Sequence, residues 1–221
     1  MALDSEAELR LKKLVRPVRG FPNPDFTFGD ITPLLADGPA LSLVIDTFAA
    51  QYKGKDVVAV AAPEARGFFF GPPLAKALGV GFLPIRKKDQ LPGETHQTGQ
   101  MQMDYGERVF ELHAGVLPSG KTGKVVIVDD ILATGTSTLA CCKLLEKLGM
   151  EVHEVAVVYD YSDGPSLLPG RKVLAKEGYS VFALARFCDE RVAGAMTWWL
   201  ERGPEEEVEI SPHMGKINKQ H

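Results

Sequence analysis

Residues 125–149, VVIVDDILATGTSTLACCKLLEKLG, decide the fold of this chain. An apolar run rich in β-branched residues leads to two carboxylates, Asp129 and Asp130, and predicts a buried strand. A short loop of small residues follows, and residues 137–148 then carry apolar side chains at helical spacing. A buried strand joined to a helix by so short a loop is typical of an α/β fold with a parallel sheet.

The same alternation continues on both sides of this segment. At the N-terminus a capping-box pattern at Ser5-x-x-Glu8 opens a predicted helix, and a loop rich in Pro and Gly is expected over residues 17–33. The residues from 86 to 106 are polar and predict a long loop. The remaining patterns predict helices over residues 5–16, 34–52, 68–78, 137–148 and 172–177, and strands over residues 57–62, 80–85, 108–112, 124–128, 152–158 and 181–185. We therefore expect a central parallel sheet with helices on both faces.

Composition excludes several classes of protein. The 221 residues include 25 Lys and Arg against 29 Asp and Glu, with 45% apolar residues, which argues against a disordered chain, a coiled coil or a duplex nucleic acid as partner. The chain has no apolar run long enough for a membrane helix and no basic, apolar leader, and its three cysteines form no disulfide framework. We expect a cytoplasmic protein without nucleic-acid or membrane partners, with one domain over residues 1–200 and a polar tail over residues 201–221.

The loop after the two carboxylates has the composition of a phosphate site. Backbone N–H groups at a helix N-terminus bind anions, and glycine lets the backbone approach a phosphate closely. The adjacent carboxylates suit ribose hydroxyls or Mg²⁺. An ordinary capped strand–helix junction would explain one acid and one hydroxyl only. The predicted ribose 5-phosphate site comprises Asp129, Asp130, Ala133, Thr134, Gly135, Thr136 and Ser137.

This segment resembles the phosphoribosyl pyrophosphate-binding motif of type I phosphoribosyltransferases. Three further segments resemble the adenine phosphoribosyltransferases among them. Residues 21–33 resemble the base-binding segment, residues 64–68 the pyrophosphate loop, and residues 85–93 the start of the mobile catalytic loop. The resemblance covers about residues 8–188. It implies that the sheet carries a small hood and a mobile loop, and that the enzyme is a homodimer.

The resemblance also implies where each part of the substrates binds. Adenine would stack on Phe28, with main-chain groups of Thr27 and Gly29 at its edge. The pyrophosphate would be bound by main-chain amides and basic side chains from a set of residues at the carboxyl ends of two predicted strands. That set is Glu64, Ala65, Arg66, Arg86 and Lys87.

Three residues are expected to act in catalysis. Asp104 and Tyr105 correspond to an acid–tyrosine pair on the mobile loop of the family, and Asp104 would take the proton that the purine loses. Arg66 would stabilise charge on the leaving pyrophosphate. Mg²⁺ would be held mainly by the substrate, with Asp129 and Asp130 as possible ligands.

Four positions depart from the family pattern. Asp104 replaces a usual glutamate, Gly29 a larger side chain, Gln90 a common lysine, and Thr136 a common glycine. A threonine in the phosphate loop requires a negative φ at that position.

The resemblance implies transfer of ribose 5-phosphate from phosphoribosyl pyrophosphate to adenine, giving AMP and pyrophosphate in purine salvage. The sequence leaves two alternatives open. One is transfer to another purine base, namely hypoxanthine, guanine or xanthine. The other is a non-catalytic regulator that senses phosphoribosyl pyrophosphate.

Overall fold

The computed structural model describes residues 3–21, 27–99, 101–103, 106–115, 123–162 and 168–187. Seven of the described strands form one sheet in the order β11-β10-β9-β3-β4-β8-β5. The first five of these run parallel to one another, while β8 is antiparallel to both β4 and β5. The bounds are β3 (Val57–Pro63), β4 (Gly81–Lys87), β5 (Thr95–Gln97), β8 (Phe110–His113), β9 (Lys124–Leu132), β10 (Glu151–Asp160) and β11 (Val181–Arg186). The sheet is therefore mixed, with a parallel centre and an antiparallel edge.

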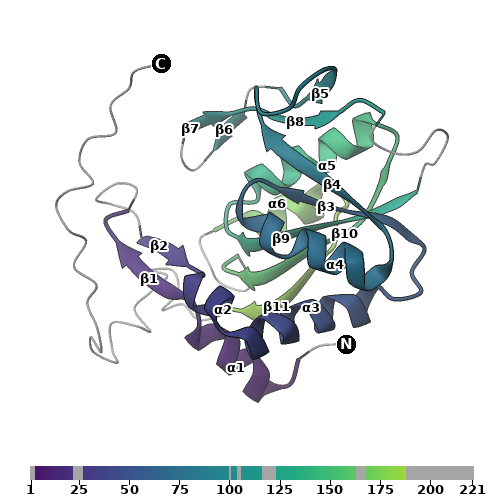
Figure 1. Ribbon diagram of the computed structural model, residues 1–221. Coiled ribbons are helices and arrows are strands. Elements are labelled where there is room, and N and C mark those ends of the chain that lie inside the picture. Colours follow the sequence, from purple (N-terminus) through teal and green to yellow (C-terminus); the bar gives the residue numbers. More distant parts are fainter. Residues whose placement is uncertain are drawn as a thin grey trace.

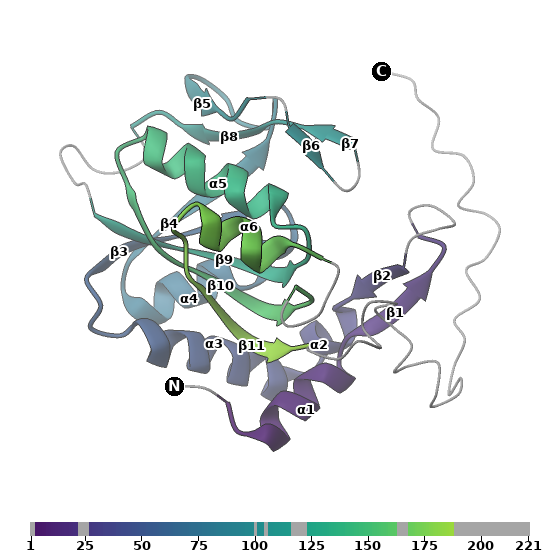
Figure 2. The ribbon, with the colours of Figure 1, turned by 180° about the vertical axis from the view of Figure 1, so that it is seen from behind.

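Helices cover both faces of this sheet (Figures 1 and 2). In Figure 1 the helices α3 and α4 lie in front of the sheet, and in Figure 2 the helices α5 and α6 do. None of the helices among the described residues is long and apolar enough to cross a membrane. The helices are α1 (Ser5–Lys13), α2 (Thr32–Ala36), α3 (Gly38–Tyr52), α4 (Gly71–Leu78), α5 (Thr136–Lys147) and α6 (Gly170–Lys176), with a 3₁₀ turn η1 (Arg66–Phe69) before α4.

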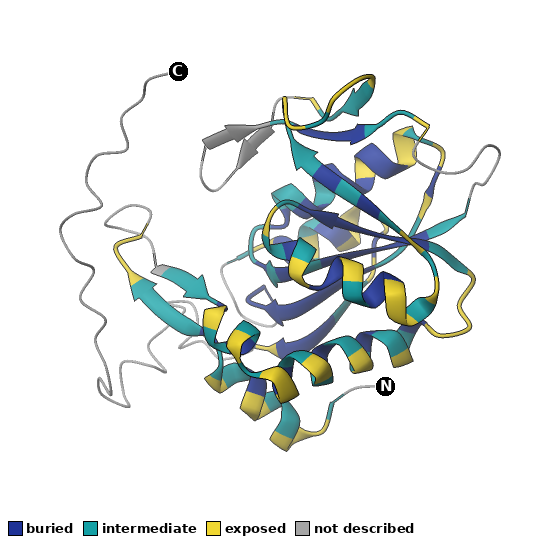
Figure 3. Cartoon of the chain, viewed as in Figure 1, coloured by how far each residue is buried: buried dark blue, intermediate teal, exposed yellow. Residues whose placement is uncertain are grey.

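Each face of the sheet has its own apolar core. Alternate residues of the central strands point to opposite faces, so Val126 and Val128 pack on the side of α1, α3 and α4, while Val125 and Ile127 pack on the side of α5 and α6. Figure 3 shows these strands as buried along most of their length. Because both faces are covered, the strands are continuously apolar in sequence, as is usual for buried parallel strands.

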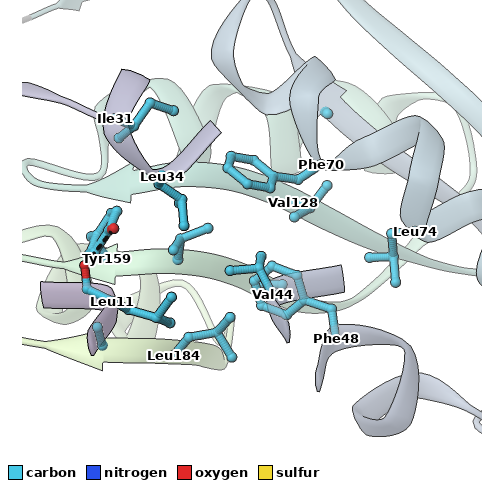
Figure 4. Packing of buried hydrophobic residues seen from close by; sticks show 14 of the residues in the cluster. Leu11, Ile31, Leu34, Val44, Phe48, Phe70, Leu74, Val128, Tyr159 and Leu184 are labelled. Carbon is cyan, nitrogen blue, oxygen red and sulfur yellow. Dashed lines mark hydrogen bonds between the residues drawn. The ribbon is translucent and has the colours of Figure 1, made fainter. Parts of the chain in front are cut away.

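The N-terminal helix is joined to the core by a buried hydrogen bond (Figure 4). The hydroxyl of Tyr159 on β10 donates to the carbonyl of Leu11 at 2.8 Å. Leu11 itself is fully buried beside Leu184 and Val44. The helix α1 thus contributes to the same core as the sheet.

Two small antiparallel pairs project at the carboxyl ends of the parallel strands (Figures 1 and 2). The first joins β1 (Arg16–Arg19) to β2 (Thr27–Asp30), and an ion pair of 2.6 Å between Arg16 and Asp30 lies on it. The second joins β6 (Met101–Met103) to β7 (Gly106–Arg108). Both pairs lie at the edge of the sheet where ligands bind in open α/β folds.

Several local expectations were wrong. The N-cap of α1 is Asp4, which accepts from the N–H of Ala7 at 2.8 Å, rather than Ser5. The helix predicted over residues 34–52 is two helices, because Asp37 accepts from the N–H of Ala40 at 2.9 Å and starts α3. The loops expected over residues 17–33 and 86–106 contain the short strands β1, β2, β5 and β6, of which β1 pairs with β2, β6 with β7 and β5 with β8.

Candidate active site

The carboxylates of Asp129 and Asp130 lie within β9 and not after its end. The strand continues to Leu132 because β10 keeps pairing with it, whereas the pairing with β3 stops at Ile127. The sheet order changes direction between β3 and β9, since β4 follows β3 on one side and β10 follows β9 on the other. The carboxyl ends of these two strands therefore form the crevice in which α/β folds bind ligands.

The two carboxylates are crowded, and that of Asp130 is shielded from water. The side chain of Asp130 is 2% exposed, and its N–H donates to Asp129 Oδ1 at 2.9 Å. Burial raises the pKa of Asp129, and the charge of Asp130 raises it further. Burial also raises the pKa of Asp130, against the opposing effect of Arg66. The pair consequently has an unsatisfied demand for positive charge or hydrogen-bond donors.

Arg66 brings three predicted subsites together. Its Nε lies 3.0 Å from Asp130 Oδ2, and its terminal nitrogen donates to the carbonyl of Gly29 at 3.3 Å. Its guanidinium carbon lies 4.9 Å from the ring centre of Phe28. The structure thus places the base segment, the pyrophosphate loop and the ribose carboxylates around one side chain.

The contact between Arg66 and Asp130 is an ion pair without a hydrogen bond. Asp130 Oδ2 is buried and accepts no hydrogen bond within the part of the chain that the structure describes. Arg66 supplies a positive charge near this oxygen, but a buried oxygen without a hydrogen-bond donor still costs free energy.

The loop after β3 contacts the end of β4 through Glu64. The Glu64–Ala65 peptide bond is cis, and the N–H of Glu64 donates to the carbonyl of Ile85 at 2.8 Å. The Glu64 carboxylate accepts from Arg86 Nε at 2.7 Å and from the N–H of Lys87 at 3.2 Å. Burial raises the pKa of Glu64, but these hydrogen bonds outweigh it and the pKa lies below its usual value. The acid is therefore charged at neutral pH and orients Arg86.

The phosphate loop approaches α6 closely. Gly135 is the N-cap of α5 with φ +79°, and a Cβ there would lie 2.8 Å from the Cα of Gly170. The N–H of Gly170 donates to the carbonyl of Ala133 at 2.9 Å. The N-cap residue of α5 is a glycine and has no capping side chain of its own, and N–H groups at such a helix start suit an anion. Thr136 is the first residue of this helix and has a helical, negative φ. A threonine can therefore take the place of the glycine that is common in the family at this position.

A buried ionic network holds α6 against the sheet. Asp160 at the end of β10 is fully buried and accepts from Arg171 Nε at 2.9 Å. Its other oxygen accepts from the N–H of Ser162 at 2.8 Å, and the hydroxyl of Ser162 accepts from the N–H of Arg171 at 2.9 Å. Sequence reasoning missed these residues, although Asp160 shows the same pattern as Asp129, an acid closing an apolar run.

Packing explains why position 29 is a glycine. A Cβ at this position would lie 3.0 Å from Ile131 Cδ1 and 3.4 Å from the hydroxyl of Tyr161. These side chains fill the space that a larger residue would need.

The remaining predicted residues divide into two groups. Ala133 and Ser137 are half-buried on either side of Gly135, and Lys87 ends β4. Thr27 begins β2, where its backbone pairs with Arg19. Asp104 and Tyr105 lie outside the described residues.

We expect Gly135→Ala to weaken substrate binding. A Cβ at positive φ and so close to Gly170 should lower the free energy of unfolding by about 2 kcal/mol and raise the KM for phosphoribosyl pyrophosphate about tenfold. Gly149→Ala is the matched control, since Gly149 has φ +77° with no atom within 4 Å of the added Cβ. Thermal unfolding and initial rates measure both effects. Equal KM values in the two variants would contradict the assignment of this loop.

Known proteins are similar to this chain along most of its length. Residues 34–174 match the family described as phosphoribosyl transferase domain. An adenine phosphoribosyltransferase from Roseiflexus castenholzii is 43% identical over 179 residues, which are 81% of this chain and 99% of the relative.

Solved structures are similar over the same region. The crystal structure of an adenine phosphoribosyltransferase from Thermoanaerobacter pseudethanolicus has a TM-score of 0.72 and 39% identity, covering 81% of this chain and 99% of that one. The enzyme from Saccharomyces cerevisiae, solved with an imino-altritol bisphosphate and adenine, has a TM-score of 0.72 and 32% identity, covering 82% and 99%.

Proposed function

The chain belongs to the phosphoribosyl transferase family, and from this premise we propose how its residues carry out the reaction. It is an adenine phosphoribosyltransferase, which transfers ribose 5-phosphate from phosphoribosyl pyrophosphate to adenine and releases AMP and pyrophosphate. The observation that carries the proposed site is the position of Arg66, within 5 Å of both the base segment and Asp130.

The N-terminus of α5 binds the 5-phosphate. Gly135, which has no side chain, is the N-cap of this helix, and backbone N–H groups at a helix N-terminus bind phosphate oxygens. The hydroxyls of Thr134 and Thr136 lie 3.3 Å apart beside it and can add donors. Asp129 and Asp130 then accept from the ribose hydroxyls, which supply donors that the buried Asp130 Oδ2 lacks among the described residues.

Basic residues at the ends of β3 and β4 bind the pyrophosphate. Arg66 follows β3, while Arg86 and Lys87 end β4. Negative charge grows on the pyrophosphate as its bond to the ribose C1 lengthens, and these cations stabilise it. The ion pair of Glu64 with Arg86 fixes the direction of that guanidinium before the substrate binds.

The base site lies on β2. The ring of Phe28 offers an apolar face for the purine, and the backbone of Thr27 and Gly29 offers donors and acceptors to its edge. Asp104, with Tyr105 beside it in sequence, takes the proton that the purine nitrogen loses as it bonds to C1.

The carboxylate oxygens of this site are suitable ligands for Mg²⁺. Two adjacent carboxylates and the undonated Asp130 Oδ2 suit a hard divalent cation. No cluster of three or more His, Cys, Asp or Glu suited to a metal occurs in the described ranges, so substrate oxygens would supply most ligands. When bound, Mg²⁺ would neutralise charge on the pyrophosphate.

We further propose a cytoplasmic homodimer, with residues 1–200 as the catalytic domain and residues 201–221 as a tail. The relatives align to most of the catalytic part, since 81% of this chain covers 99% of one of them. Gel filtration with light scattering and removal of the tail test the two assignments.

Product analysis tests the function. The purified protein with Mg²⁺ and phosphoribosyl pyrophosphate should convert adenine to AMP and release one pyrophosphate per AMP. Hypoxanthine, guanine and xanthine, assayed separately, should react at least about a hundredfold more slowly, because a site that matches hydrogen bonds rejects bases with the wrong donors. Preferred turnover of another base would reassign the substrate, and binding without pyrophosphate release would leave only a sensing role.

A further inference from the structure

The carboxylate of Glu111 is buried at the antiparallel edge of the sheet. The residue is 2% exposed and lies on β8 between the buried side chains of Phe110 and Leu112. Its strand partners are Arg86 on β4 and Gln97 on β5. Glu111 therefore lies between the strand that ends in the candidate pyrophosphate cations and the strand that leads toward Asp104.

Donors from two segments converge on this carboxylate. Oε1 accepts from the N–H groups of Gln90 and Leu91 at 2.9 and 2.8 Å. Oε2 lies 3.4 Å from the hydroxyl of Thr95 and 3.3 Å from Gln97 Nε2, and accepts from both. A buried charge is tolerated only when its oxygens are satisfied in this way.

The backbone after β4 is shaped around the same carboxylate. Asp89 has φ +64°, which is uncommon for a residue other than glycine. Successive N–H groups then face Glu111, as they face anions in other backbone concavities. Burial raises the pKa of Glu111, but the N–H groups of Leu91, Gln90 and Asp89 outweigh it and lower the pKa overall. The charge is therefore a permanent part of this turn at neutral pH.

Glu111 is more than a packing residue, because an apolar side chain in its place would leave the N–H groups of Gln90 and Leu91 without this acceptor. The carboxylate joins residues 89–91 to β5. The two segments that it joins lie between Lys87 and Asp104 in the chain. They therefore connect the candidate pyrophosphate residues to the candidate general base of the reaction.

We propose that Glu111 is a positioning residue of the transfer reaction, which holds the segment leading to Asp104 in register with the strand that carries Arg86 and Lys87. This inference rests on the proposed function. Glu111 touches no reactant and acts through the backbone of residues 90 and 91.

The test compares Glu111→Leu with Glu111→Gln in the full chain. The leucine should lower kcat for AMP formation about thirtyfold and change the KM for adenine less than about threefold, because positioning errors act mainly on the chemical step. Amide hydrogens of Gln90 and Leu91 should exchange at least about tenfold faster. The glutamine keeps one carbonyl oxygen for those two donors and should restore kcat to within about threefold of the unsubstituted enzyme.

Asp37→Ala is the control for loss of a carboxylate that accepts from a backbone N–H elsewhere, at the start of α3. It should lower the melting temperature and leave kcat unchanged. If Glu111→Leu does not fold, Gln97→Met removes one donor to Oε2 and should lower kcat about threefold at an unchanged melting temperature. Wild-type kcat in Glu111→Leu despite faster exchange at residues 90 and 91, or in a folded Gln97→Met, overturns the inference. Absence of AMP formation by the unsubstituted enzyme would instead overturn the proposed function.

Discussion

The double substitution Asp129→Asn plus Asp130→Asn should lower kcat/KM for phosphoribosyl pyrophosphate about a thousandfold or more. Two charged acceptors for the ribose hydroxyls disappear together, and removal of even one preorganised electrostatic contact commonly costs 10²–10³-fold. The amides keep the shape of the carboxylates, so the loss reports on charge. Initial rates and equilibrium binding of phosphoribosyl pyrophosphate measure it.

The same variant should be at least as stable as the unsubstituted protein at neutral pH. Burial and mutual repulsion raise the pKa of Asp129 and burial raises that of Asp130. An acid whose pKa is raised on folding binds its proton more tightly when folded, so its ionisation makes stability fall as the pH rises above the usual range for aspartate. The double variant lacks this loss, and its melting temperature should depend less on pH between acidic and neutral conditions.

The control removes two exposed charges outside the proposed site. Asp46 and Asp56 are exposed on α3 and just before β3, and Asp46→Asn plus Asp56→Asn should leave kcat/KM within about twofold because exposed charges far from a site contribute little. A folded Asp129→Asn plus Asp130→Asn variant with full activity would remove both residues from the ribose site.

Asp104→Ala should lower kcat about a hundredfold and change the KM for either substrate less than about threefold. A general base typically contributes 10²–10⁴-fold, and it acts in the transition state more than in substrate binding. Asp104→Glu tests whether a longer side chain also brings the carboxylate to the purine proton. The family usually has glutamate at this position, so this variant should keep most of the activity. Steady-state kinetics with each substrate varied separates kcat from KM.

Glu94 provides the matched control for this loop acid. It is exposed, and only its backbone carbonyl enters a described contact, with the N–H of Ala114. Glu94→Ala should therefore leave kcat unchanged. A similar loss of kcat in both variants would assign the effect to the net charge of the loop, and an unchanged kcat in Asp104→Ala would exclude it as the base.

The segment around β9 was predictable because its information is local. The apolar run before Asp129, the small residues around Gly135 and the helical spacing after them each depend on neighbours in sequence. The strand end was placed too early, because β9 reaches Leu132 only through pairing with β10, a strand almost 30 residues further along.

The edges of the site were less predictable because their strands are short. β1 and β2 have only four residues each and pair with each other in a stretch whose Pro and Gly content predicts a loop. No sequence motif marks Asp160 or Glu111, and their contacts appear only when Arg171 and the turn at residues 89–91 close around them.

The sequence by itself determined the fold class, the family resemblance and the loop proposed to bind phosphate, because short-range patterns of apolar, acidic and small residues encode them. Tertiary structure decided which of those residues meet. Arg66 reaches Asp130 and Gly29 only because the ends of β3, β9 and β2 converge at one edge of the sheet. Gly135 requires glycine both for its positive φ and because Gly170 lies against it. Such contacts depend on side chains and turns brought together from distant segments, where sequence spacing carries no distance information.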